Sequence, residues 1–176
     1  HTGLASQVAA GDVSLAVVWI GSNDLAPYNS LFPQIYNGTL TGSALQTQLD
    51  TIFGRIETAY ETIDAAGDVR FVGFTLGDFT LYPGIDSLYP DAAGLARVHD
   101  AVQYINSELV SYADTHQFPL IVADSYLADV LHTGSILNVG GVNIDMDPAN
   151  GSSNPHSGFV ADKLHANTVT AGIIAN

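Results

Sequence analysis

The sequence contains no cysteine and only four basic side chains, Arg55, Arg70, Arg97 and Lys163, against 18 acidic ones. The absence of cysteine excludes thiol nucleophiles, zinc–thiolate sites, iron–sulfur clusters and disulfides. The formal net charge of −14 repels phosphate backbones, so we expect no nucleic-acid partner. No stretch approaches the ~20 consecutive apolar residues of a membrane-spanning helix. We therefore expect no membrane span.

The chain does contain enough apolar sequence for a hydrophobic core. It has 176 residues, of which 47% are hydrophobic, and this length suits one domain. No linker rich in proline or serine divides it, so we expect a single domain over residues 1–176. Scarce lysine, many small residues and high acidity favour an exported or salt-tolerant protein, and we expect a secreted or otherwise extracytoplasmic one.

Three short segments are almost continuously apolar, which is typical of strands covered on both faces. They are residues 13–20, 70–76 and 118–124. Strands that alternate with helices predict right-handed crossovers and a parallel sheet with helices on both faces. The sequence therefore predicts an α/β fold.

Two segments between these strands carry apolar side chains at steps of three and four residues, which predicts amphipathic helices. The first begins near Ser43, which with Gln46 matches a capping box. The second covers about residues 91–116, and a last short helix is predicted from about residue 162.

Ligands of parallel sheets bind outside the carboxyl ends of the strands, so the residues that follow each predicted strand are candidates. After the first strand comes Gly21-Ser-Asn-Asp24. Behind a tight turn at Gly21, the amide of Asn23 can donate to a developing oxyanion. Ordinary turn chemistry uses the same residue types and explains them as well.

Asp162 and His165 form the strongest chemical pair in the sequence. A carboxylate three residues before a histidine, at a helix start, can reach the ring Nδ1–H. That contact fixes the tautomer and leaves Nε2 as a general base. The alternative is a helix-capping aspartate beside a surface histidine.

The segment Val17-Val-Trp-Ile-Gly-Ser-Asn-Asp24, followed much later by Asp162-Lys-Leu-His-Ala-Asn167, resembles the SGNH (GDSL-type) hydrolases. The resemblance implies a three-layer α/β/α sandwich of flavodoxin-like form. It implies that Asn23 is an oxyanion-hole donor, with Gly21 and Asp24 as its neighbours in the block. It also implies that Asp162 orients His165, the base of a Ser-His-Asp triad. The implied activity is hydrolysis of carboxylic esters, as in an esterase, a lipase or a carbohydrate deacetylase, without a metal or cofactor.

Two blocks of that family are missing from this sequence: the one with the nucleophilic serine, and a separate glycine that gives the family a further oxyanion donor. The family's nucleophilic serine lies in a Gly-Asp-Ser block after an earlier strand, and no such block precedes Gly21. We therefore expect that the fold lacks its first strand here, that the domain is incomplete at its N-terminus and possibly at its C-terminus, and that the serine lies upstream. A missing N-terminal piece of the same protein is then a candidate partner. Ser125, after the third predicted strand, is the alternative nucleophile, although its use needs a different strand order, and a turn or N-cap serine is its structural interpretation.

The expected substrate is a neutral acyl ester or an acetylated sugar, because so many carboxylates disfavour an anionic one. A non-catalytic module of the same fold, which binds carbohydrate or a partner chain, is the competing hypothesis. The missing nucleophile favours that module, whereas the joint presence of Asn23, Asp162 and His165 favours the enzyme. The oxygen-rich segment Asn143–Asp147 could suit Ca²⁺, but it lacks the full ligand spacing, and a plain polar loop is the favoured interpretation.

Overall fold

The computed structural model describes residues 3–82, 85–123, 134, 136–161, 165, 167–168 and 170. The chain forms two compact units, which are described separately. The first comprises His1–Gly77 and Ala93–Ala123, and the second comprises Asp78–Ala92 and Asp124–Asn176. The single domain expected from the sequence stays a prediction.

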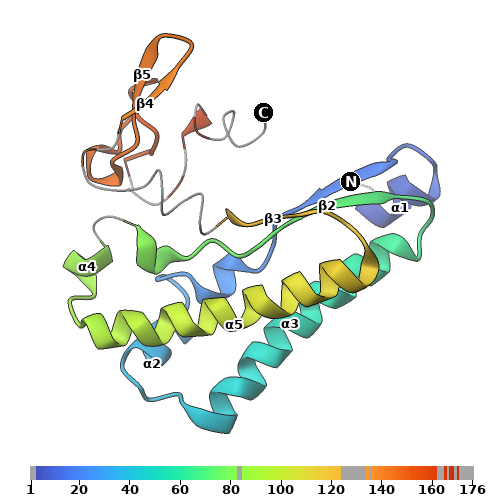
Figure 1. Cartoon of the computed structure of the whole chain (residues 1–176), viewed down its shortest axis with the longest axis horizontal. Coiled ribbons are helices and arrows are strands. Elements are labelled where there is room, and N and C mark those ends of the chain that lie inside the picture. Colours follow the sequence, from blue (N-terminus) through green and yellow to red (C-terminus); the bar gives the residue numbers. More distant parts are fainter. Residues whose placement is uncertain are drawn as a thin grey trace. The chain divides into compact units, whose positions relative to one another are not determined.

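The first unit is built on a three-stranded parallel sheet with the strand order β1-β2-β3 (Figure 1). The strands are β1 (Leu15–Val18), β2 (Arg70–Phe74) and β3 (Leu120–Ile121). Each lies inside one of the three apolar segments, so the predictions of these strands and of a mixed α/β fold with a parallel sheet are confirmed. The register pairs Leu15 with Arg70 and Gly73 with Leu120.

Two long helices, α3 (Gly42–Asp64) and α5 (Ala92–His116), connect the strands and confirm the predicted amphipathic helices. The capping box is wrong, because the helix begins one residue before Ser43 and its N-cap, Thr41, makes no side-chain cap hydrogen bond. Gln46 Nε2 instead donates to Asp50 Oδ1 at 2.8 Å. Two shorter helices, α1 (Leu4–Ala9) and α2 (Leu31–Tyr36), and the 3₁₀ helix η1 (Ser22–Leu25) complete this unit.

The helices α3 and α5 both pack against one face of the sheet (Figure 1). Tyr60 of α3 lies edge-on to Phe71 of β2, with ring centroids 5.3 Å apart, and stacks on Phe118 at 5.0 Å. Tyr112 of α5 packs against Tyr60 at 5.8 Å. Because the three strands neighbour one another in chain order, two right-handed crossovers must run over the same face.

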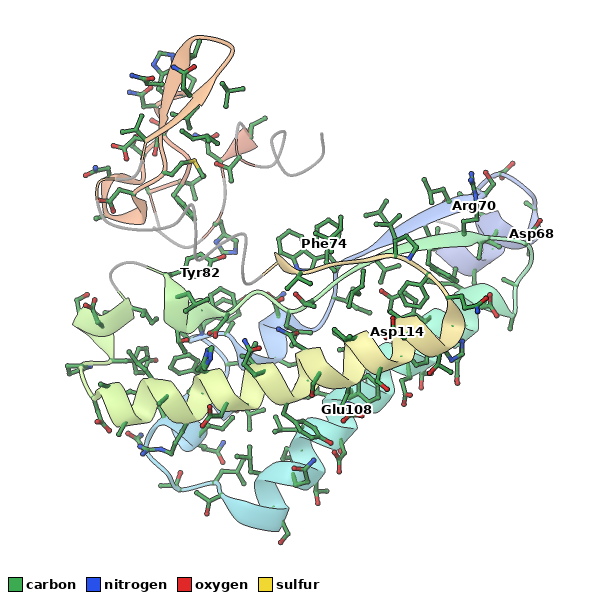
Figure 2. All side chains as sticks on the ribbon, in the orientation of Figure 1. Asp68, Arg70, Phe74, Tyr82, Glu108 and Asp114 are labelled. Carbon is green, nitrogen blue, oxygen red and sulfur yellow. The ribbon has the colours of Figure 1, made fainter. Side chains whose placement is uncertain are left out.

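The opposite face of the sheet is apolar and open to solvent among the described residues. Leu15 and Val17 are 49% and 63% exposed, and Ile121 of β3 is 43% exposed. Phe74 lies at the carboxyl end of β2 (Figure 2). Trp19 stacks on it, with ring centroids 5.1 Å apart. Among the described residues, helices therefore cover only one face of the sheet, whereas the sequence predicted helices on both faces.

The second unit contains α4 (Ile85–Leu88), the 3₁₀ helices η2 (Phe79–Leu81) and η3 (Pro148–Asn150), and an antiparallel hairpin of β4 (Ile136–Val139) and β5 (Val142–Asp145). Its buried cluster consists of Ile144, Met146 and Phe159, against which Tyr82 packs. Gly140 and Gly141 form the hairpin turn with φ of 58° and 85°. Positive φ at both central residues is what a two-residue turn between twisted strands requires.

Candidate active site

The turn after β1 favours glycine at its first residue. Gly21 has φ of +100°, a conformation that side chains other than glycine rarely adopt. A Cβ atom there would lie 2.7 Å from Ile56 Cδ1 and 3.3 Å from Leu76 Cδ1. The positive φ therefore favours glycine, and the tips of the Ile56 and Leu76 side chains would have to shift to admit a Cβ atom. The predicted tight turn at Gly21 is confirmed. The 3₁₀ helix η1 follows directly and carries Asn23 and Asp24.

Hydrogen bonds fix the segments that follow β1 and β2 to each other. The Gly77 N–H donates to Ser22 Oγ at 3.0 Å. One residue earlier, the Leu76 N–H donates to Asn106 Oδ1 of α5 at 2.7 Å, and Asn106 Nδ2 donates back to the Leu76 carbonyl at 3.2 Å. The carboxyl edge of the sheet is thus held by two side chains, Ser22 and Asn106. Asn106 was not among the predicted site residues. The sequence signal that could have identified it is a polar amide next to the apolar stripe of its helix.

Asn23 is exposed, and its carboxamide is held from one side. The Tyr28 hydroxyl donates to Asn23 Oδ1 at 2.6 Å. Among the described residues, Asn23 Nδ2 donates no hydrogen bond. An amide fixed through its oxygen, with its N–H groups available, is what an oxyanion donor requires. The supporting role of Tyr28 was not predicted from the sequence.

The second block of the resemblance lies only partly within the described residues. His165 is exposed, and its carbonyl accepts a hydrogen bond from the Val160 N–H at 3.0 Å. Asn167 follows, and its N–H donates to the Gly158 carbonyl at 2.8 Å, so backbone hydrogen bonds bracket the histidine. Asp162, the candidate partner of His165, lies outside the described residues, as does Ser125.

The candidate residues belong to separate units. Asn23, with Gly21 and Asp24, belongs to the first unit, and His165 belongs to the second. The predicted meeting of the oxyanion donor with the histidine therefore stays a prediction. Most of the last predicted helix, from residue 162 onwards, also lies outside the described residues.

The segment after Gly77 holds a buried carboxylate that sequence reasoning passed over. Asp78 is fully buried and accepts hydrogen bonds from the Thr80 N–H at 2.8 Å and the Thr80 hydroxyl at 2.6 Å. Burial and the nearby Asp78 carboxylate raise the pKa of Tyr82 to about 12 (Figure 2). The Thr80 hydroxyl donates to a carboxylate held in the loop, so this threonine caps the turn. Within the described part of the chain, no histidine accepts its proton, as activation of a nucleophile would require.

The oxygen-rich segment that could suit Ca²⁺ uses its carboxylates within the loop. Asp145 accepts from the Asp147 N–H at 3.0 Å and from Asn150 Nδ2 at 2.9 Å. Asp147 accepts from the Ala149 N–H at 2.8 Å and from the Gly134 N–H at 2.9 Å. All four carboxylate oxygens thus accept hydrogen bonds from the protein, as in an ordinary polar loop. No group of three or more potential metal-ligating side chains occurs in the part of the chain that the structure describes.

Comparisons with known proteins give no further assignment. No protein-family model matches the chain, and searches of curated proteins and of solved structures find no match either. None of the helices described in the structure has the length and apolarity that a membrane crossing requires.

Proposed function

We propose that this chain is part of a serine hydrolase of the SGNH type, which cleaves neutral carboxylic esters. The observation that carries the proposal is the turn after β1. There, a glycine with φ of +100°, Gly21, leads into an amide, Asn23, whose oxygen is held by Tyr28 and whose nitrogen donates to no described residue. This turn follows the carboxyl end of a parallel strand, where α/β proteins bind their ligands.

The proposed fold is the three-layer α/β/α sandwich of that family. In such a sandwich a second helical layer covers the sheet face that carries Leu15 and Val17, which are 49% and 63% exposed among the described residues. That apolar surface supports the proposal, because strands with solvent on one face usually alternate with polar side chains.

In the proposed mechanism, a serine attacks the ester carbonyl carbon while His165 Nε2 takes the hydroxyl proton. The carbonyl oxygen becomes an oxyanion that accepts a hydrogen bond from Asn23 Nδ2. When the tetrahedral intermediate collapses, the carbon–oxygen bond to the alcohol breaks, and His165 gives its proton to the departing alcohol. A water then releases the acyl group from the serine by the same steps, with Asp162 orienting the imidazole throughout.

We place the nucleophilic serine on a segment upstream of His1, which would dock as an N-terminal piece of the same protein. Ser125 is the alternative within this chain. We also propose an extracytoplasmic location, on the grounds of the net charge of −14 and the scarcity of lysine.

A non-catalytic binding module of the same fold is the second candidate. The observation that favours it is that the 176 residues contain no Gly-Asp-Ser block to supply a nucleophile.

Steady-state hydrolysis of a neutral ester such as p-nitrophenyl acetate, by the full-length protein, tests the proposal. Asn23→Ala should lower kcat by about two to three decades with little change in KM. His165→Ala should lower it by roughly three or more decades. Asn37→Ala, at the exposed C-cap of α2, is the control and should leave kcat unchanged. Normal turnover in the Asn23 and His165 variants would refute the assignment, and a wild-type protein without esterase activity would favour the binding module.

A further inference from the structure

A polar cavity opens in the first unit beside the Asn23 turn. Its volume is about 350 Å³, and its walls come from η1, from the start of α2 and from α3. This volume lies in the range of small-molecule sites. The polar residues that line it are Asp24, Asn29, Ser30, Gln34, Gln48, Thr51 and Arg55.

Several of these side chains have unused hydrogen-bonding capacity. Asp24, Gln48 and Arg55 make no side-chain hydrogen bond or ion pair with another described residue. Asn29 Oδ1 accepts from the Leu31 N–H at 3.0 Å, which leaves its amide nitrogen to donate. Gln34 Nε2 donates to the Ser30 carbonyl at 2.9 Å, which leaves its side-chain oxygen to accept. The cavity therefore presents both donors and acceptors to a ligand.

The charges of the cavity select a neutral ligand. One carboxylate, Asp24, and one guanidinium, Arg55, line it, so its formal charge is balanced. The chain as a whole carries a net charge of −14, which repels anions at long range. A fatty acyl tail is also disfavoured, because it would cover these polar groups without replacing their hydrogen bonds to water.

A hydroxyl group both donates and accepts, so a polyhydroxylated molecule can use Asp24, Gln48 and Arg55 together. Leu31, Leu40 and Ile52 also line the cavity and offer apolar contact to the C–H groups of such a molecule. We propose that this cavity binds a neutral sugar or polyol. The idea that this sugar or polyol is the alcohol part of the ester substrate rests on the proposed function, whereas its binding to the cavity does not.

Titration calorimetry and saturation-transfer NMR of the intact protein with neutral methyl glycosides test this inference. We expect saturable binding that Arg55→Gln weakens at least about tenfold, because a hydrogen bond to a charged group is lost. Arg70→Gln, on the exposed start of β2, is the matched control and should bind as the wild type does.

A second pair of variants compares two threonines of the same helix. Thr51 lines the cavity and Thr58 does not, yet both are exposed and both hydroxyls donate to the carbonyl four residues before, each at 2.7 Å. Thr51→Val should weaken glycoside binding and Thr58→Val should not. Since the two substitutions remove the same helix contact, a difference between them reports on the cavity.

The outcomes separate this inference from the proposed hydrolase. No glycoside binding, equal binding by all variants, or a preference for acetate or phosphate ions would each overturn the polyol site. Ester hydrolysis without glycoside binding would overturn it too, while leaving the hydrolase intact. Glycoside binding that depends on Arg55 and Thr51, in a protein without esterase activity, would support the cavity and overturn the hydrolase.

Discussion

Replacement of Gly21 by alanine tests whether the candidate oxyanion turn depends on both backbone conformation and space. An alanine at φ of +100° costs about 1–2 kcal/mol, because Cβ approaches the following carbonyl oxygen. The new Cβ would also lie 2.7 Å from Ile56 Cδ1, and Ile56 is buried at 4% exposure. Overpacking of this kind adds about 1–3 kcal/mol. Gly21→Ala should therefore lower the free energy of unfolding by about 2–5 kcal/mol.

Gly11→Ala is the matched control for the backbone contribution. Gly11 has φ of +76°, and nothing lies within 4 Å of the position of its Cβ. It should cost only the conformational part, about 1–2 kcal/mol. Urea denaturation, followed by the fluorescence of the single tryptophan, Trp19, measures both values.

A double-mutant cycle isolates the steric contribution. Ile56→Val removes the Cδ1 atom that the new Cβ at position 21 would meet, and it costs about 0.5–1.5 kcal/mol alone. In that background Gly21→Ala should cost about 1 kcal/mol less than in the wild type, which is coupling of the size seen between residues in contact. Additive losses, or equal losses for Gly11→Ala and Gly21→Ala, would refute the packing described for this turn.

Three further predictions concern the buried amide of Asn106, the ring of Tyr60 and the hydrogen bond from Tyr28 to Asn23. Asn106→Ala removes both partners of the buried Leu76 backbone groups and should lower the free energy of unfolding by about 2–4 kcal/mol in urea. Burial raises the pKa of Tyr60 from 10.0 to about 12, so the folded state keeps a proton that the unfolded state releases. The stability that this group contributes is fully present below pH 10.0 and is lost as the pH rises through about 12. Unfolding measured at a series of pH values should show a smaller loss of stability in Tyr60→Phe than in the wild type. Tyr28→Phe frees Asn23 Oδ1 and should lower kcat for the neutral ester about three- to tenfold, with KM unchanged.

The controls for these variants come from matched positions. Ser107→Ala removes an exposed hydroxyl next to Asn106 and should change stability by less than about 0.5 kcal/mol. Tyr104→Phe removes an exposed hydroxyl that donates to Asp50 at 2.8 Å, and it should leave kcat unchanged. If Asn106→Ala lowers the free energy of unfolding no more than Ser107→Ala does, the two hydrogen bonds between Asn106 and Leu76 do not stabilise the fold. If Tyr60→Phe loses stability at alkaline pH as much as the wild type does, titration of Tyr60 is not the cause of that loss.

The sequence allowed the first unit to be predicted better than the second, for physical reasons. Apolar runs and steps of three and four residues reveal strands and helices, and these predicted β1, β2, β3, α3 and α5. Periodicity shows that a residue is apolar but not what covers it, so the exposure of Leu15 and Val17 was missed. The hairpin of β4 and β5 was not predicted, although the Gly140-Gly141 pair between its β-branched residues is a usable turn signal.

The candidate site was predictable at the backbone level and less so at the level of side chains. The turn at Gly21 followed from its place after a predicted strand. The contact between Tyr28 and Asn23 depends on the path of an irregular loop, for which sequence spacing gives no rule. The N-cap of α3 was not predicted correctly either, because Thr41 and Ser43 are both good N-cap residue types and the sequence alone does not distinguish them.

The most direct test of the central claim is covalent labelling of the full-length protein with a fluorophosphonate, followed by mass spectrometry of the intact protein and its peptides. Such a probe reacts with a serine that a neighbouring base activates. We expect one label per molecule, on a serine upstream of His1, and loss of the label in His165→Ala. A label on Ser125 or on another serine of this chain would contradict the placement of the nucleophile. Absence of any label on folded protein would contradict the serine hydrolase itself.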